Sequence, residues 1–310
     1  MIKGDTVIFI VGPTAIGKTR FSIKLARLLK GEIITCDSMQ VYRGMRVLSQ
    51  APSPEERSQV RHHLAGILDP RKEYSVAAFR ERATALIRTV IGRGKAPIVV
   101  GGSGLYAKAL VDGLFPAPEA DLRFRAKMQK YALRYGSIRL HAKLLKIDPA
   151  SAGAIHPNDE RRIIRALEIY QATGKTMTAL KSATKGLKNR YDVRIFGLTA
   201  PRQEIYARIG SRVDRMFEEG IVDEVRRLKR RRLSRTARAA LGFKEVAGYL
   251  DGGRSLDAAK ELLKMNTRRF AKRQLAWFRA DGRIAWYDVT RIGEAAMIRN
   301  IREDVWNEHY

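Results

Sequence analysis

A glycine-rich segment near the start of the chain constrains the fold more than any other feature. Gly12 and Gly17 are separated by four residues and are followed by Lys18 and Thr19, which is the spacing of a phosphate-binding P-loop. The apolar run 7–11 comes directly before this segment, and apolar residues at helical spacing follow it. The order of strand, loop and helix predicts an α/β fold with a phosphate site where the first strand ends.

The P-loop, residues 12–19, predicts a diphosphate ligand. Backbone N–H groups of such a loop converge on phosphate oxygens, and the N-terminus of the following helix adds a partial positive charge. Lys18 would reach the outer phosphate, and the Thr19 hydroxyl would ligate Mg²⁺, which we predict as the cofactor. The predicted diphosphate-binding residues of the loop are Gly12, Pro13, Thr14, Ala15, Ile16, Gly17, Lys18 and Thr19.

Two further strand ends bear on the same site. The strand predicted at 32–35 ends just before Asp37, and the strand predicted at 97–100 runs into the glycines of 101–104. Because parallel strands end at one edge of a sheet, Asp37 is expected to face the crevice beside the P-loop. Alternatively, Asp37 caps the turn that follows it. The strand at 97–100 lacks the carboxylate that P-loop NTPases usually place there.

The pattern of strands is interrupted in the middle of the chain. Strand signals fade between residues 117 and 192, where helices are predicted at 124–135, 137–145 and 160–173. A strand at 193–198 then returns to the sheet. We therefore predict a P-loop NTPase-like parallel sheet core, 1–116 plus 193–310, with a helical insertion domain, 117–192, and a helical C-terminal part.

The long helix predicted at 256–280 combines basic and apolar residues. Basic residues recur every four positions and so form one ridge, at Lys260, Lys264, Arg268 and Lys272. Leu263, Phe270 and Trp277 recur every seven residues, and we expect them in the core rather than as stacking surfaces for bases.

The net charge of +28, from 60 Lys and Arg against 32 Asp and Glu, favours a polyanionic partner. Nucleic acid suits such a charge better than a membrane, and a solubility bias is the alternative explanation. The opening apolar run is too short for a signal peptide or a membrane helix. The single cysteine, Cys36, excludes a disulfide framework and a zinc site of paired cysteines. We expect a cytoplasmic monomer that does not bind membranes.

Several motifs taken together resemble those of the bacterial tRNA dimethylallyltransferase (tRNA isopentenyltransferase) family. They occur in the family's order at 12–19, 37–45, 101–106, 158–168, 212–216, 242–245 and 267–278. The resemblance implies transfer of a dimethylallyl group from dimethylallyl diphosphate to N6 of the adenine 3′ to the anticodon in tRNA, with release of pyrophosphate. It also implies that the insertion domain contacts the anticodon arm of tRNA.

The resemblance implies roles for individual residues. Arg208 and Arg212 join the diphosphate ligands. Asp37 is the candidate base for the N6 proton, and Lys18, Thr19 and Ser103 complete the catalytic set. The candidate tRNA-binding residues are Asp37, Ser38, Met39, Gln40, Ser103, Arg123, Arg161, Arg162, Arg165, Gly242, Phe243, Lys244, Lys272, Arg273 and Gln274.

The sequence departs from the family pattern at three places. Ser103 and Phe243 stand where the family usually has Thr and Tyr, and residues 46–51 read Arg-Val-Leu-Ser-Gln-Ala where it often has Asp-Ile-Gly-Thr-Ala-Lys. Two other functions stay open at this point. One is a small-molecule kinase of the shikimate-kinase type, which shares the P-loop and the following Asp. The other is an RNA-binding P-loop protein without catalytic activity.

Overall fold

The computed structural model describes residues 5–115 and 118–306. It divides into two compact units, one formed by Met1–Val111 with Leu187–Tyr310 and the other by Asp112–Gly186. The border predicted between 116 and 117 lies outside the described residues. The second border comes a few residues earlier than the predicted one at 192, because the 3-10 helix η1 (Leu187–Asn189) packs with the first unit.

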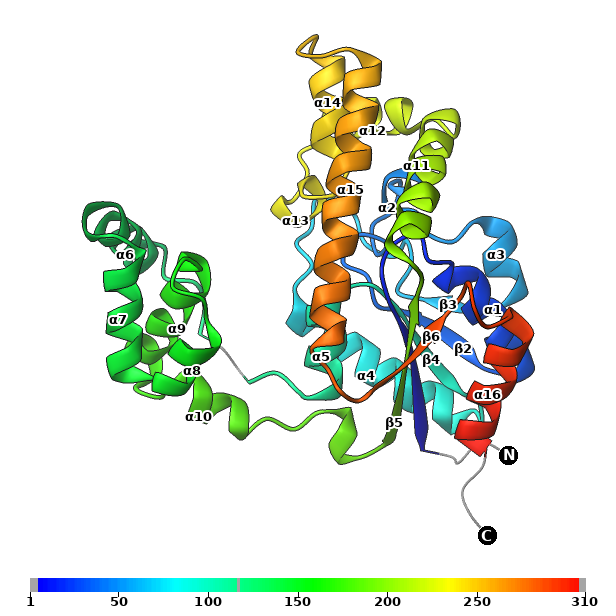
Figure 1. The fold of residues 1–310 in the computed structure, drawn as a ribbon, viewed down its shortest axis with the longest axis horizontal. Helices are drawn as coiled ribbons and strands as arrows, with labels where there is room; N and C mark the ends of the chain where they lie inside the picture. The colour runs from blue at the N-terminus through cyan, green and yellow to red at the C-terminus, as the bar shows by residue number, and fades with distance from the viewer. Residues whose placement is uncertain (1–4, 116–117, 307–310) are drawn as a thin grey trace. The chain divides into compact units, whose positions relative to one another are not determined.

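A parallel six-stranded sheet forms the centre of the first unit (Figure 1). The strands are β1 (Thr6–Val11), β2 (Glu32–Thr35), β3 (His62–His63), β4 (Pro97–Gly101), β5 (Asp192–Thr199) and β6 (Ile284–Asp288), in the order β3-β2-β4-β1-β5-β6. Every residue of β1 is buried, because this strand pairs with β4 on one side and β5 on the other. All the pairings are parallel, so the loops after the strands meet at one edge.

Helices cover the sheet and extend the first unit beyond it (Figure 1). Helix α15 contacts α14, α11 and α5. The helices of this unit are α1 (Lys18–Leu28), α2 (Arg46–Ser49), α3 (Pro54–Gln59), α4 (Val76–Gly92), α5 (Gly104–Val111), α11 (Arg202–Glu218), α12 (Ile221–Lys229), α13 (Arg235–Arg238), α14 (Phe243–Leu250), α15 (Leu256–Arg279) and α16 (Glu294–Trp306).

The second unit is helical and has its own hydrophobic core. Its carboxylate Glu168 is almost fully buried and accepts hydrogen bonds from Arg125 and Arg165. The two ends of the unit are held together, since the Thr184 hydroxyl donates to the carbonyl oxygen of Asp112 at 3.1 Å. The helices are α6 (Leu122–Tyr135), α7 (Ser137–Ile147), α8 (Pro149–Ala154), α9 (Glu160–Thr173) and α10 (Met177–Ser182).

The predicted α/β fold with a parallel sheet is confirmed, and one part of it needs correction. The bounds of β2 and α9 are as predicted, and the other predicted elements differ by a few residues at their ends. The C-terminal part is not purely helical, because β6 joins the edge of the sheet beside β5. Only Ile284 of this strand is buried, because β6 lies at the edge of the sheet. No helix in the described part of the chain is long and apolar enough to cross a membrane.

A substitution at Gly101, the last residue of β4, tests how closely the ends of β2 and β4 pack. A Cβ atom at this position would lie 1.9 Å from the carbonyl oxygen of Cys36, the residue that follows β2. We expect Gly101→Ala to lower the free energy of unfolding by about 3 kcal/mol or more, measured by urea denaturation, because the two backbones must separate. Gly92→Ala is the matched control. Gly92 is the exposed last residue of α4 with open space around it, so alanine there should stabilise by about 0.5 kcal/mol. Equal melting of the two variants would contradict this.

Candidate active site at the carboxyl edge of the sheet

A cleft of about 820 Å³ lies within the first unit, where the carboxyl ends of its central strands meet. Its walls come from the P-loop, the segments after β2 and β4, α3 and the loop before it, and residues of α11 and α15. Most of the side chains that line it are polar or charged. The cleft is therefore suited to an anionic ligand rather than an apolar one.

The backbone of the P-loop has the shape that the motif predicts. Gly12 has a φ of 141°, and a Cβ there would lie 2.5 Å from the carbonyl oxygen of Leu198. Ala15 and Gly17 also have positive φ angles, which turn successive N–H groups toward one side in anion-binding loops. Helix α1 begins at Lys18 with no side-chain cap and no acidic residue in its first turn. Its free N–H groups are therefore available to an anion.

Lys18 is folded back onto the loop that carries it. Its Nζ atom donates to the carbonyl oxygens of Gly12 at 3.0 Å and Pro13 at 2.7 Å. Burial and, to a smaller extent, the nearby Arg212 lower the pKa of Lys18 to about 7, although Asp37 acts in the opposite direction. A diphosphate in the cleft would favour the charged form of Lys18, because it places negative charge beside the ammonium group.

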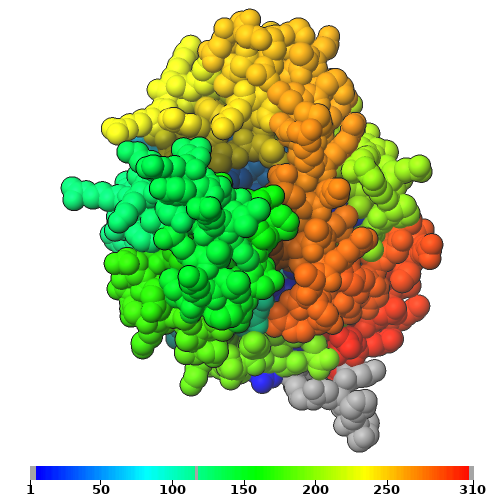
Figure 2. Space-filling model, turned by 60° about the vertical axis from the view of Figure 1, so that its left-hand side comes forward, coloured from blue at the N-terminus to red at the C-terminus, as the bar shows by residue number. Residues whose placement is uncertain are grey.

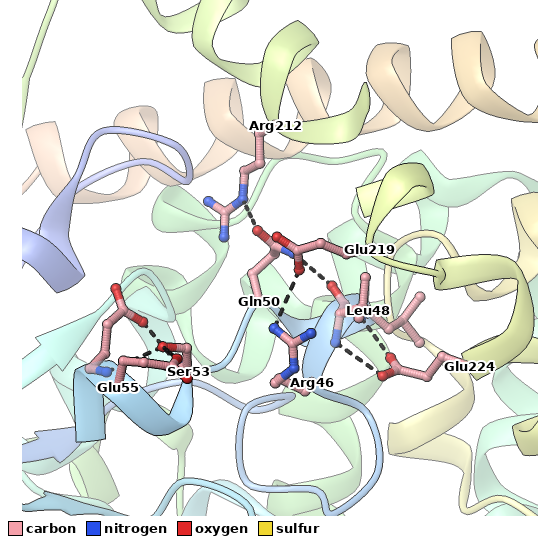
Figure 3. A network of polar contacts seen from close by, with 10 residues as sticks. Arg46, Leu48, Gln50, Ser53, Glu55, Arg212, Glu219 and Glu224 are labelled. Atoms are coloured by element: carbon pink, nitrogen blue, oxygen red, sulfur yellow. Dashed lines mark hydrogen bonds and ion pairs between the residues drawn. The ribbon is translucent and has the colours of Figure 1, made fainter. Parts of the chain in front are cut away.

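Arg212 reaches the P-loop from α11. Its Nε atom donates to Oε1 of Gln50 at 2.9 Å (Figure 3). Its Nη1 atom donates to the hydroxyl of Thr14 at 3.0 Å. Burial lowers the pKa of Arg212 to about 10, so the guanidinium stays charged at neutral pH. Arg208, one turn earlier, also lines the cleft and donates from Nε to Glu204 at 2.7 Å. The two predicted arginines thus lie beside the P-loop.

Asp37 combines the two roles that the sequence left open. Its Oδ1 atom accepts the backbone N–H groups of Met39 at 2.8 Å and Gln40 at 3.3 Å, so it caps the turn after β2. The residue also lines the cleft, and Oδ2 accepts no hydrogen bond from the described part of the chain. Burial raises the pKa of the Asp37 carboxyl, and the two backbone hydrogen bonds oppose this rise. One carboxylate oxygen is therefore available to a ligand.

Gln274 of α15 connects two loops at the base of the cleft. Its Oε1 atom accepts the backbone N–H of Thr14 at 2.8 Å, and its Nε2 atom donates to the carbonyl oxygen of Gly102 at 2.9 Å. A Cβ on Gly102 would lie 2.2 Å from Nε2 of Gln274, so only glycine fits there. The sequence predicted that Gln274 contacts tRNA, whereas both ends of its amide are occupied within the protein.

The other residues predicted after β2 and β4 differ in their exposure to the cleft. Gln40 lines it and donates from Nε2 to the carbonyl oxygen of Gln50 at 3.1 Å. Ser38, Met39 and Ser103 are half-buried neighbours of lining residues but do not line the cleft themselves. Ile16 is buried, and Thr14, Ala15, Gly17 and Thr19 line the cleft as the motif predicts.

The basic residues predicted on α14 and α15 are exposed. Lys244, Lys272 and Arg273 face solvent, and the surface of α15 forms an orange band with α11 beside it in Figure 2. Phe243 needs a correction, because its ring is only 9% exposed and packs in the main core. Its neighbour Gly242 is also buried and has a positive φ at the start of α14. These two residues shape the helix start and offer no ring for stacking.

The arginines predicted in the second unit fall into two groups. Arg123 and Arg161 are exposed, and so is Arg162, which forms an ion pair with Asp159 at 3.3 Å. Arg165 is half-buried instead and pairs with the buried Glu168 and the carbonyl oxygen of Pro118. Its local role is to neutralise a buried carboxylate.

The expectation for the seven-residue repeat of α15 is wrong at two of its three positions. Leu263 is buried, but Phe270 lines the cleft and Trp277 is 38% exposed beside Gly104. The repeat fails because α15 packs against α14, α11 and α5. A single apolar stripe therefore does not describe the buried face of this helix.

Two functional candidates escaped the sequence analysis. Gln50 holds Arg212, and Glu224 of α12 accepts the backbone N–H groups of Val47 and Leu48 at the start of α2 (Figure 3). The departure of residues 46–51 from the family pattern was the available signal, but it did not show what the new residues contact.

The comparisons with known proteins agree with this geometry. The IPP transferase family model matches residues 40–281, and the isopentenyl transferase model matches residues 5–72. The chain belongs to the IPP transferase family. It is 48% identical over 286 residues to the tRNA dimethylallyltransferase of Carboxydothermus hydrogenoformans, covering 92% of each chain. It is 46% identical over 289 residues to that of Halothermothrix orenii, covering 92% of this chain and 88% of the relative.

Solved structures of IPP transferases also resemble this chain. The full-length tRNA isopentenylpyrophosphate transferase of Bacillus halodurans is 42% identical with a TM-score of 0.72, covering 98% of this chain and 96% of the other. A eukaryotic dimethylallyltransferase acting on tRNA is 29% identical with a TM-score of 0.78, covering 98% and 80%. The family resemblance drawn from the sequence motifs is confirmed.

The pKa of Lys18 gives a prediction for the IPP transferase without ligand. Its folded value is about 7 against an ordinary value of 10.5, so above pH 7 the unfolded chain binds the proton that the folded chain has lost. Lys18 therefore makes the free energy of unfolding rise with pH in this range. We expect the free energy of unfolding of the parent, relative to Lys18→Met, to increase between about pH 7 and pH 9 in urea titrations.

The variant Lys18→Arg serves as the control for charge. Arginine stays protonated in the folded and unfolded chains, so this variant should lose the same pH dependence while keeping the positive charge. Parallel curves for the parent and Lys18→Met over this range would contradict the prediction.

Proposed function

We propose that this chain transfers a dimethylallyl group from dimethylallyl diphosphate to N6 of the adenine 3′ to the anticodon in tRNA, and releases pyrophosphate. The observation that carries the proposal is that one cleft holds a P-loop, the cations Lys18 and Arg212, and a carboxylate with a free oxygen at Asp37. The first two suit a diphosphate leaving group, and the third suits the amine that attacks. The relatives are tRNA dimethylallyltransferases, which supports tRNA and dimethylallyl diphosphate as the substrates.

The diphosphate would bind where charges and N–H donors converge. The N–H groups of the P-loop, the Lys18 ammonium and the Arg212 guanidinium stabilise negative charge that grows on the diphosphate as its bond to the allylic carbon breaks. The loop and Arg212 are in place before the ligand arrives, whereas Lys18 would exchange its bonds to the carbonyl oxygens of Gly12 and Pro13 for the diphosphate. The exposed lining of the cleft also allows pyrophosphate to leave.

Magnesium fits this site as a partner of the diphosphate. No group of three or more His, Cys, Asp and Glu side chains that could hold a metal occurs within residues 5–115 and 118–306. Mg²⁺ commonly uses few protein ligands together with phosphate oxygens and water. The Thr19 hydroxyl lines the cleft beside Lys18 and would be its protein ligand. When bound, the ion would add positive charge next to the leaving diphosphate.

Asp37 would accept the proton from the attacking amine. The N6 lone pair of adenine is delocalised into the ring, so N6 needs help as a nucleophile. As the N6–carbon bond forms and the carbon–oxygen bond to diphosphate breaks, N6 gains positive charge and loses a proton to Oδ2 of Asp37. The raised pKa of Asp37 suits this role, because it makes the carboxylate a better proton acceptor.

The adenine must leave its stack in the anticodon loop to reach this cleft. Base-modifying enzymes swing the target base into a pocket, and loop bases cost less to unstack than paired ones. Exposed lysines and arginines on both units supply contacts to the phosphate backbone, which accounts for the charge of +28. We propose that the chain acts in the cytoplasm as a monomer.

The comparisons support this function over the two alternatives. The curated relatives are tRNA dimethylallyltransferases and match about nine-tenths of the chain. A small-molecule kinase of the shikimate type would not be expected to resemble prenyl transferases over this length. The P-loop and Asp37 are intact and share one cleft, which disfavours an RNA-binding protein without activity.

The direct test is a transfer assay. The protein is incubated with Mg²⁺, unmodified tRNA and dimethylallyl diphosphate, and the digested nucleosides are analysed by mass spectrometry. We expect one prenylated adenosine, located 3′ to the anticodon. Its absence would remove the proposal, and ATP-dependent phosphorylation of a small hydroxy acid would favour the kinase.

Asp37→Asn separates the proton acceptor from the fold. Asparagine keeps the oxygen that caps the turn but is not basic, so we expect kcat to fall about 10²–10⁴-fold with tRNA affinity nearly unchanged. The matched control is Asp257→Asn in the first turn of α15, an exposed residue outside the cleft, which should keep parental turnover. Near-normal turnover of Asp37→Asn would exclude Asp37 as the base.

Arg161 and Arg165, one turn apart on α9, are predicted to act differently. Arg161→Gln removes an exposed cation, so tRNA binding should weaken and the slope of log affinity against log salt should drop by about one. Arg165→Gln removes a positive charge that neutralises the buried carboxylate of Glu168, so this variant should mainly lower the melting temperature. Filter binding at several salt concentrations and thermal melts measure both effects. A reversed pattern would assign the tRNA contact to Arg165.

A further inference from the structure

Two neutral acceptors fix the orientation of the Arg212 guanidinium. Gln50 Oε1 lies 2.9 Å from its Nε atom, and the Thr14 hydroxyl lies 3.0 Å from its Nη1 atom. The Nη2 atom has no hydrogen-bond partner in the described part of the chain. Two bonds to different loops thus fix the side chain and leave its remaining N–H groups for a ligand in the cleft.

The acceptors of Arg212 differ in charge from those of other arginines that line the cleft. Arg46 pairs with the carboxylate of Glu219 at 3.3 Å, and Arg208 pairs with the carboxylate of Glu204 at 2.7 Å (Figure 3 shows the first pair). Gln50 is neutral, so it directs the guanidinium without neutralising it. Arg212 therefore forms no direct ion pair with a carboxylate in the described part of the chain.

The backbone of Gln50 adopts a conformation that glutamine disfavours. Its φ of 52° and ψ of 44° lie in the left-handed region, at the residue that follows α2. Glycine and asparagine adopt this conformation more readily, so local stability alone does not explain a glutamine. Its side-chain Nε2 donates to the carbonyl oxygen of Val47 at 2.8 Å, which turns Oε1 toward Arg212. Strained residues of this kind concentrate at functional sites.

Hydrogen bonds to Glu224 and from Gln40 fix the segment that carries Gln50. The buried carboxylate of Glu224 accepts the N–H groups of Val47 at 3.0 Å and Leu48 at 2.7 Å, which fixes the start of α2 (Figure 3). Gln40 donates from Nε2 to the carbonyl oxygen of Gln50 at 3.1 Å. The position of Gln50 is therefore determined by the fold and does not depend on Arg212.

We infer that Gln50 is a positioning residue that aims the guanidinium of Arg212 at the diphosphate, and that the anchored segment 46–51 serves to present it. The inference rests on the proposed function, because it assigns the diphosphate as the ligand. A long arginine side chain loses rotamer freedom when it binds an anion, and Gln50 removes that cost before binding. Gln50 makes no contact with the ligand in this role and acts only through Arg212.

A double-mutant cycle with inorganic pyrophosphate tests the inference. The proteins are the parent, Gln50→Gly, Arg212→Ala and the double variant, and calorimetry in Mg²⁺ gives their affinities. Glycine is chosen because it fits the positive φ, where alanine would add strain. We expect Gln50→Gly to weaken binding about tenfold in the parent and to change nothing once Arg212 is absent.

The controls separate this result from a loss of fold and from a failure of the proposed function. Gln59→Ala, at the exposed end of α3 and outside the cleft, should bind pyrophosphate like the parent. Gln50→Asn keeps the amide and suits the left-handed backbone but is too short, so it should behave like Gln50→Gly. Equal losses from Gln50→Gly with and without Arg212, or no loss at all, would overturn the inference. The cycle needs no transfer activity, so it stands even if the parent prenylates no tRNA.

Discussion

The two hydrogen bonds of Gln274 hold together the parts of the cleft that the rest of the site depends on. They join the N–H of Thr14 in the P-loop to the carbonyl oxygen of Gly102 after β4. These loops leave neighbouring strands of the sheet, and a buried amide on α15 keeps them in register. Thr14 then supports Arg212, which in turn contacts Gln50. The site is thus a chain of neutral hydrogen-bonding groups that positions a few charges.

The charges of the cleft attract one another without forming a direct ion pair in the described part of the chain. There, Lys18 donates to backbone oxygens, Arg212 donates to neutral side chains, and Asp37 accepts backbone N–H groups. Burial lowers the pKa of Lys18 and of Arg212 and raises the pKa of Asp37, which favours the neutral form of each group. Such a site is unfavourable without a ligand and becomes favourable when an anion binds beside the cations. Stability is given up locally for readiness to bind, a common property of active sites.

The sequence was informative where one motif determines local geometry, and less so where the fold brings distant segments together. The P-loop, Asp37 and the parallel sheet could be predicted because spacing and strand ends define them. Gln274 was assigned to tRNA because nothing in its own helix shows that Thr14 lies opposite. The sequence places Phe243 among the tRNA-binding residues because its pattern does not distinguish a core aromatic residue from an exposed one, and the structure buries its ring. Gln50 went unnoticed because its partner is 162 residues away.

The bond between Thr184 and Asp112 has a consequence for how such a chain arose. The second unit leaves the core after Val111 and returns at Leu187, and its two connecting segments touch each other. A segment whose ends meet can be added to a sheet protein without cutting a strand or moving its neighbours. The catalytic core and the inserted helices have separate interiors, so mutations that repack one need not disturb the other. The proposed tRNA contacts of the inserted helices can therefore change while the residues of the cleft stay the same.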